Sequence, residues 1–174
     1  GAAGAFDLLE TTTLTTSASS VTFSGLGAYS DYKHLQLRFV MQNDLNGSAR
    51  DFHFNLNGDT GSNYSSHSLQ GNGTSVSSTS STTATKIMGI FTPDANAGNA
   101  NAFGVGIMDI LDFSNSSKNT TIRMLQGSPV SDYPRIGLVS GLYINTAAIT
   151  SFLIRNDGNQ PIITGSRFSL YGVK

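Results

Sequence analysis

Large apolar residues alternate with mostly polar ones along the segment His34–Gln42. The apolar positions are Leu35, Leu37, Phe39 and Met41. Because successive side chains of a β-strand point to opposite faces of the sheet, this period of two predicts a strand with one face in a hydrophobic core. It is the clearest signal of secondary structure in the chain.

The segment Asp51–Leu56 repeats this pattern after a short connection. One set of its side chains is expected to point into the core, namely Phe52, Phe54 and Leu56, and the other to point outward, namely Asp51, His53 and Asn55. The connection Asn43–Arg50 contains an Asn46-Gly47 dipeptide, which suits the positive φ angles of a tight turn. The two segments are therefore predicted to be antiparallel neighbours in one sheet.

Other short apolar runs, separated by Gly, Asn, Ser and Thr, predict the remaining strands. They lie at Phe6–Leu14, Val21–Phe23, Tyr64–Gln70, Lys86–Phe91, Phe103–Phe113, Thr121–Gln126, Ile136–Ile144, Ile149–Arg155 and Arg167–Val173. Between them, Gly71–Thr85 has Val76 as its only large apolar residue. We interpret that stretch as a long exposed loop or a frayed edge segment.

About nine or ten short strands with regular turns between them are typical of a sandwich or barrel. We therefore predict an all-β fold, an antiparallel β-sandwich of jelly-roll type with little or no helix. Residues 1–5 are expected to form a flexible lead-in, and residues 6–174 a single domain. A longer open sheet that feeds a fibre is the less favoured alternative.

The polar composition supports the absence of helices. Glu occurs once, at Glu10, and Lys four times, whereas Ser, Thr, Asn and Gly are abundant. Exposed helix faces are normally filled with Glu, Lys, Gln and Arg, while Ser, Thr and Asn suit strands and turns because they bond to nearby backbone.

Charge and cysteine content exclude several classes of function. The net charge is −1 and the ten Lys and Arg residues are scattered, so no surface for tracking phosphates, and hence no nucleic-acid partner, is expected. No apolar stretch is long enough for a membrane span, and no signal peptide is recognisable. The chain has no cysteine, which removes disulfides, thiol nucleophiles and zinc–cysteine sites and is compatible with assembly in a reducing cytosol.

The turn-rich stretch after Leu56 contains the tripeptide Asp59-Thr60-Gly61, which is the short motif of aspartic proteases. That chemistry needs two aspartates that share a proton, and the chain has no second motif. Oxygen ligands at Asn57, Asp59 and Asn63 leave a calcium site as an alternative, although the spacing is not that of an EF-hand. We expect a turn capped by Asn and Asp side chains.

Other candidates for chemistry are dispersed. His34, His53 and His67 lack the spacing of metal ligands, and we expect ordinary outward-facing residues there. Asp109 and Asp112 are the nearest pair of carboxylates, but polar residues near a strand end explain them more simply. The sequence thus predicts no catalytic residue, metal or cofactor, and a protein that is not an enzyme.

Several stretches resemble a group of small virion proteins of tailed bacteriophages, notably phages of cyanobacteria. The similarity is carried by residues 9–14 (LETTTL), 19–23 (SSVTF), 34–38 (HLQLR), 56–65 (LNGDTGSNYS), 71–73 (GNG), 141–143 (GLY), 146–151 (TAAITS) and 168–172 (FSLYG). The resemblance implies a β-sandwich displayed on the particle as a capsid decoration protein or as a head-fibre or tail-fibre component. It makes the loop with Asn57, Asp59, Asn63 and Tyr64 the candidate ligand or contact loop.

The leading hypothesis is therefore a non-enzymatic structural protein of the virion surface, assembled in the bacterial host cytoplasm. We expect it to form a homo-oligomer, a homotrimer or another symmetric assembly, and to contact major capsid or tail proteins. The alternative is a receptor-binding or carbohydrate-binding module that contacts host surface glycan, because jelly rolls often present sugar sites. Candidate stacking residues for a sugar are Tyr29, Tyr32, Tyr64 and Tyr133.

Overall fold

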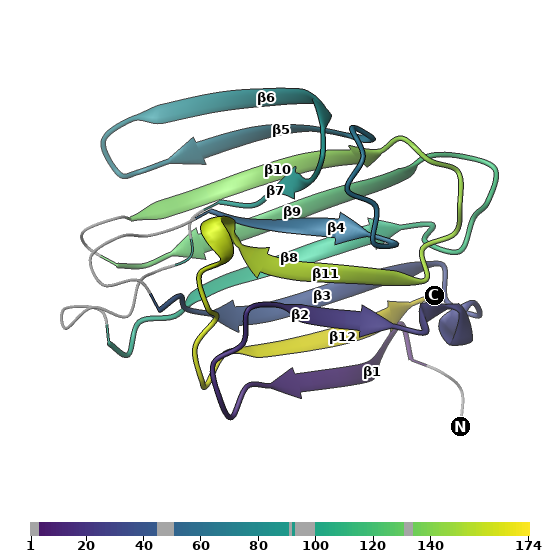
Figure 1. Ribbon diagram of the computed structural model, residues 1–174, viewed down its shortest axis with the longest axis horizontal. Coiled ribbons are helices and arrows are strands. Elements are labelled where there is room, and N and C mark those ends of the chain that lie inside the picture. Colours follow the sequence, from purple (N-terminus) through teal and green to yellow (C-terminus); the bar gives the residue numbers. More distant parts are fainter. Residues whose placement is uncertain (1–3, 45–50, 91, 93–99, 131–133) are drawn as a thin grey trace.

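A computed structural model describes residues 4–44, 51–90, 92, 100–130 and 134–174. These residues form two antiparallel sheets, of eight and four strands, packed face to face as a sandwich (Figure 1). The all-β sandwich expected from the sequence is confirmed. In the described part of the chain, the helical segments are two short 3-10 turns, Leu26–Tyr29 and Asp157–Asn159.

The larger sheet has the strand order β1-β12-β3-β8-β9-β10-β5-β6. All of its neighbouring strands are antiparallel. In Figure 1, β1 and β6 lie at its two opposite edges. The bounds of its strands are β1 Phe6–Thr13, β3 His34–Met41, β5 Tyr64–Gly71, β6 Val76–Ala84, β8 Gly104–Leu111, β9 Thr120–Ser128, β10 Arg135–Tyr143 and β12 Arg167–Val173.

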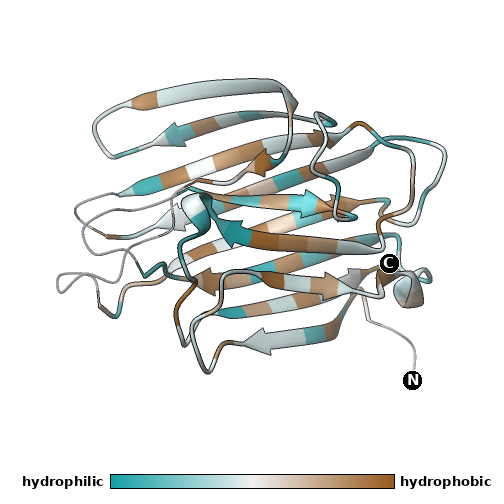
Figure 2. Ribbon diagram, viewed as in Figure 1, coloured by the Kyte–Doolittle hydropathy of each residue, from teal (hydrophilic) through white to brown (hydrophobic). Residues whose placement is uncertain are grey.

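The smaller sheet has the order β2-β11-β4-β7 and covers one face of the larger sheet. Its strands are β2 Val21–Ser24, β4 Phe52–Leu56, β7 Ile87–Met88 and β11 Ser151–Asn156. Brown apolar positions recur along the strands of both sheets in Figure 2, as expected where alternate side chains meet in a common core. The other face of the larger sheet has no second layer over it in the described structure, and we call it the outer face.

Aromatic rings join the two sheets in the core. The ring of Phe39 in β3 meets that of Phe52 in β4 edge to face, with 5.4 Å between centroids. Gly106 lies opposite Phe39 in the larger sheet, and a Cβ at that glycine would come within 2.2 Å of the Phe39 ring. A glycine is required at this position because the ring packs directly on the backbone of β8.

The prediction that the two strongest alternating segments are neighbours is wrong. β3 lies between β12 and β8 in the larger sheet, whereas β4 lies between β11 and β7 in the smaller one. The chain changes sheet between Met41 and Phe52, so both strands face the same core from opposite sides. The predicted Asn46-Gly47 turn lies outside the described residues.

The prediction that His53 and Asn55 point outward is also wrong, because every residue of β4 is buried. Asn55 donates from Nδ2 to the carbonyl groups of Asp59 (2.9 Å) and Thr85 (2.8 Å), so local chain segments cover it. Alternation showed which side chains enter the core, but it did not reveal that the opposite face of this strand is covered too.

The stretch Gly71–Thr85 contains an ordered edge strand, β6, which pairs with β5 over most of its length. The stretch therefore lies at a sheet edge, as one alternative expected, but Val76–Ala84 is a paired strand and neither frayed nor a loop. By contrast, within the described part of the expected strand Lys86–Phe91, the strand is limited to the two residues of β7. The described residues form twelve strands, more than the nine or ten expected.

Candidate interaction surface

The predicted contact loop is a turn between β4 and β5 that is tied to neighbouring segments. Asn57 has φ 52° and Gly58 has φ 67°, so the chain reverses through two left-handed residues. The side chain of Asn57 donates to the carbonyl of Ala148 (3.0 Å) and accepts from the backbone N–H of Thr150 (2.8 Å). It therefore fixes the turn to the segment before β11.

Asp59 is the centre of a hydrogen-bond network within this turn. Its Oδ1 accepts from the Gly61 N–H at 2.7 Å, and its Oδ2 accepts from Asn63 Nδ2 at 2.8 Å and from the Tyr143 hydroxyl at 2.9 Å. The hydrogen bond from Asn63, followed by the one from Gly61, lowers the pKa of Asp59 below its usual value. The carboxylate thus stays ionised and acts as a cap for the turn.

Tyr64 lies beneath the turn, fully buried, and its ring stacks on that of Tyr143 with 5.0 Å between centroids. Its hydroxyl oxygen accepts from the Leu56 N–H (3.0 Å), and the hydroxyl donates to the Asp59 carbonyl (2.8 Å). Burial, and then the hydrogen bond to Asp59, raises the pKa of Tyr143, which keeps that hydroxyl a donor. The structure brings Asp59, Asn63 and Tyr64 together as structural supports, while Asn57 bonds to a different segment.

The three histidines occupy three separate environments. His34 lies near Asp112, with 3.5 Å between Nδ1 and Oδ1, at one end of the larger sheet. His53 is buried in the smaller sheet, where burial, followed by the charges of Lys86 and Arg155, lowers its pKa to about 4. His67 is exposed on the outer face. Within the described ranges, no three His, Asp or Glu side chains gather in a group that could hold a metal ion.

The two carboxylates considered for acid–base chemistry have separate partners. Asp109 bonds to Arg123 (2.7 Å) and to Gln36 (2.9 Å), and Asp112 pairs with Lys118. Among the described residues, no helix is long and apolar enough to cross a membrane.

The outer face carries the most prominent exposed feature of the described chain, a patch of large aliphatic side chains. Six of them, 42–63% exposed, project from four adjacent strands. These residues, which we call the outer apolar patch, are Leu69 on β5, Ile136 and Leu138 on β10, Leu125 on β9, and Val105 and Ile107 on β8.

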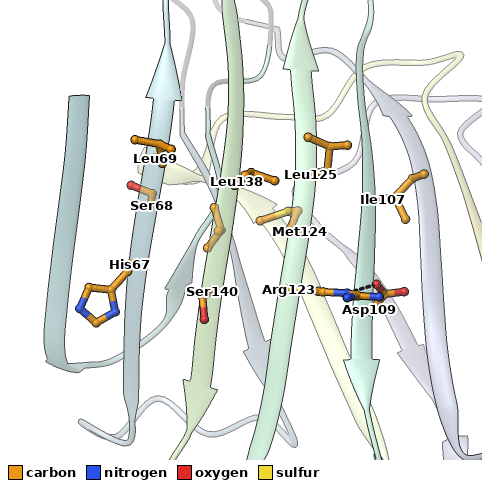
Figure 3. Close-up of a pocket in the computed structure, with 11 residues that line it drawn as sticks. His67, Ser68, Leu69, Ile107, Asp109, Arg123, Met124, Leu125, Leu138 and Ser140 are labelled. Atoms are coloured by element: carbon orange, nitrogen blue, oxygen red, sulfur yellow. Dashed lines mark hydrogen bonds and ion pairs between the residues drawn. The ribbon is translucent and has the colours of Figure 1, made fainter. Parts of the chain in front are cut away.

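Strand register arranges most of this patch in a row across the sheet. Leu138 is directly opposite Leu69 on one side and Leu125 on the other, and Leu125 is in turn opposite Ile107. Directly opposed Cβ atoms on one face of an antiparallel sheet are about 5 Å apart, so the four side chains touch in sequence. Figure 3 shows the row on neighbouring strands.

A row of polar side chains runs beside the leucines. His67 is opposite Ser140, Ser140 is opposite Arg123, and Arg123 is opposite Asp109. In Figure 3 the Arg123–Asp109 ion pair is drawn next to the apolar side chains. A hollow of about 600 Å³ lies between the two rows. The surface therefore combines a row of apolar side chains with an adjacent row of hydrogen-bonding groups.

Gly127 shapes the other side of the patch. It lies between Val105 and Ile136, its partners on the two adjacent strands. Because glycine has no side chain, a second hollow of about 480 Å³ lies between these two aliphatic residues.

The sequence of β8 contains a signal for this surface. Residues 104–111, GVGIMDIL, are apolar at almost every position instead of every second one. In an antiparallel sheet this means that apolar residues also occupy the face opposite the core.

No protein-family model matches this sequence, and no curated protein matches it closely enough to indicate a relative.

The described tyrosines among those suggested as stacking residues for a sugar have structural roles. Tyr64 is buried, and the hydroxyls of Tyr29 and Tyr32 donate to Glu10 and Asp7, each at 2.9 Å. Tyr133 lies outside the described residues.

Proposed function

We propose that this chain is a non-enzymatic structural protein on the surface of a tailed bacteriophage particle, and that the outer apolar patch is its contact with a neighbouring virion protein. The single observation that supports this contact is the row of exposed leucines and one isoleucine across four strands. The resemblance of the strand and loop sequences to small virion proteins supports the particle as its location.

The patch has the physical properties of a binding surface. Its exposed side chains present an apolar area on the order of 500 Å², at the upper end of what monomeric proteins leave uncovered. Elsewhere, the exposed positions of β6 carry mainly Ser and Thr. Removing water from a flat aliphatic area is favourable and needs no matching charge, whereas the Arg123–Asp109 pair at the rim can set orientation.

The partners proposed are other copies of the chain and a major capsid or tail protein. A compact sandwich without disulfides gains additional stability from such contacts, because a partner that binds only the folded state shifts the folding equilibrium. The oligomer and its virion contacts would form in the host cytoplasm before the particle is released.

The test is re-binding of purified chain to particles of its own phage from which it has been removed. Leu138→Asp places a charge at the centre of the patch and is expected to weaken binding at least tenfold. Thr121→Asp is the matched control, because Thr121 is exposed on β9 outside the apolar row, and it should bind like the wild type. Absence of the chain from purified virions, or unchanged binding of Leu138→Asp with its circular dichroism spectrum intact, would contradict the proposal.

A carbohydrate-binding module of a tail fibre is the second candidate, favoured by the hollow beside the polar row. Arg123, Asp109 and His67 offer the donors and acceptors that sugar hydroxyls require. Leu138 adds an apolar side chain to the lining of the hollow. A glycan array probed with the wild type and with Arg123→Ala separates the candidates. A glycan signal lost in Arg123→Ala supports this function, and absence of any glycan signal excludes it.

A further inference from the structure

The larger sheet ends at β6 with one side of that strand unpaired in the described structure. From Val76 to Ser81, β6 pairs with β5 in a regular register in which Leu69 is opposite Ser78 and His67 is opposite Ser80. The register shifts only beyond Ser81, near Thr83, whose φ is 52°. The Asn72 N–H donates to the Ser75 carbonyl at 3.1 Å, so Asn72 and Ser75 form a hydrogen-bonded pair of the hairpin. This pair determines which of the following pairs are hydrogen-bonded. Since bonded and non-bonded pairs alternate in antiparallel strands, the backbone N–H and C=O groups of Val76, Ser78 and Ser80 point away from β5.

The part of this edge from Val76 to Ser80 lacks the features that usually prevent strands from pairing, because the irregularity of β6 lies beyond Ser81. β6 has nine residues, and the stretch from Gly71 to Thr85 contains no charged residue and no proline. Edge strands are normally protected by charges, prolines, bulges or short length. The uncharged segment from Val76 to Ser80 therefore presents a regular set of free donors and acceptors.

The opposite edge of the same sheet is protected. β1 carries Asp7 and Glu10, and its pairing with β12 is interrupted by an irregularity between Leu8 and Glu10. Addition of one copy's β6 to another copy's β1 would meet these charges and this distortion. Repeated head-to-tail growth into a fibre is thus disfavoured, and pairing of β6 with itself remains.

We propose that β6 pairs with β6 of a second copy of this chain, antiparallel and about a two-fold axis at Ser78. This register places Ser78 opposite Ser78 of the second copy and Val76 opposite Ser80, so all three free residues exchange main-chain hydrogen bonds. The facing side chains are Ser, Thr and Val, and no like charges meet. The pairing closes on itself and gives a dimer with one continuous sheet.

The dimer has a geometric consequence for the outer apolar patch. A two-fold axis of an antiparallel strand pair is perpendicular to the sheet, so both outer faces point in the same direction. The two patches would then form one larger surface on one side of the dimer. The pairing itself does not depend on what the outer patch binds.

Cysteine cross-linking tests the register directly, because the chain has no cysteine of its own. In the proposed dimer, the Cα atoms of Ser78→Cys are about 5.5 Å apart, within disulfide range, and mild oxidation should give a covalent dimer in high yield. Ser80→Cys is the matched control, because its two copies are offset by four residues, roughly 13 Å, and should not cross-link. A mixture of Val76→Cys and Ser80→Cys should form the mixed disulfide.

Light scattering coupled to size exclusion tests the association. The wild type and Ser78→Ala should have twice the 18.3 kDa mass of the chain, and Ser78→Pro should be monomeric. Proline removes an N–H that β5 does not use, so the hairpin should persist in circular dichroism. A monomeric wild type at high concentration, or cross-linking of Ser80→Cys as efficient as that of Ser78→Cys, would overturn the proposal. Because Leu138→Asp should remain dimeric, failure of particle binding and failure of β6 pairing are distinguishable.

Discussion

Replacing Tyr143 by Phe removes one hydroxyl from the network around Asp59 and leaves the buried ring in place. In the wild type this hydroxyl donates to Asp59 Oδ2 at 2.9 Å, while the ring stacks on Tyr64. The phenylalanine ring keeps that stacking, so the change reports on the hydrogen bond alone.

A hydrogen bond to a charged group contributes about 1.5–3 kcal/mol to stability. Asp59 is only half-buried and keeps its bonds from Asn63 and Gly61, so the low end, about 1.5 kcal/mol, is expected at pH 7. For a chain of this size the loss corresponds to a decrease in Tm of roughly 3–6 °C.

The pH dependence identifies the carboxylate as the partner. The pKa of Asp59 is lower in the folded state, so its contribution is present above the unfolded-state pKa and is lost as pH falls through the folded-state pKa. The difference in unfolding free energy between wild type and Tyr143→Phe should therefore be largest near pH 7 and should shrink in acid as the Asp59 carboxylate becomes protonated.

Urea denaturation at several pH values, at one fixed protein concentration, measures this difference. Tyr29→Phe is the control, because it removes a hydroxyl bonded to Glu10 away from the turn, and it should change stability less than Tyr143→Phe does. The reasoning is refuted if Tyr143→Phe is as stable as the wild type at pH 7, or if its deficit does not decrease at the lowest pH at which both proteins still fold.

Two further predictions concern two glycines of the larger sheet and the buried His53. Gly106→Ala should destabilise the fold by about 1–3 kcal/mol, because its Cβ would meet the Phe39 ring, whereas Gly127→Ala, whose nearest neighbour would be 3.7 Å away, should be close to neutral in thermal unfolding. His53 has a pKa near 4 when folded and about 6.5 when unfolded, so the wild type should lose up to roughly 3 kcal/mol of stability as pH falls through that interval. His53→Gln should lack this part of the decline in urea titrations at pH 7 and pH 4.5, and an identical decline would contradict it.

The candidate loop illustrates what local sequence can and cannot predict. The Asn and Gly residues at 57 and 58 indicated a turn, and both adopt the positive φ angles such residues allow. Its main anchor, Tyr143, is more than eighty residues away in the chain and was not predicted, because no local pattern specifies which strand lies beneath a turn.

The arrangement of the strands likewise separates what local sequence determines from what only the tertiary structure decides. A period of two at residues 34–41, and short polar turns between apolar runs, determined by themselves that the chain forms antiparallel strands around one core. These are local consequences of side-chain alternation and backbone preference. Only the tertiary structure decided that β3 and β4 belong to different sheets, that four strands cover eight on one face, and that β6 ends the sheet. Those choices depend on pairing between distant segments, which composition and periodicity leave open, and they determine which side chains remain exposed to a partner.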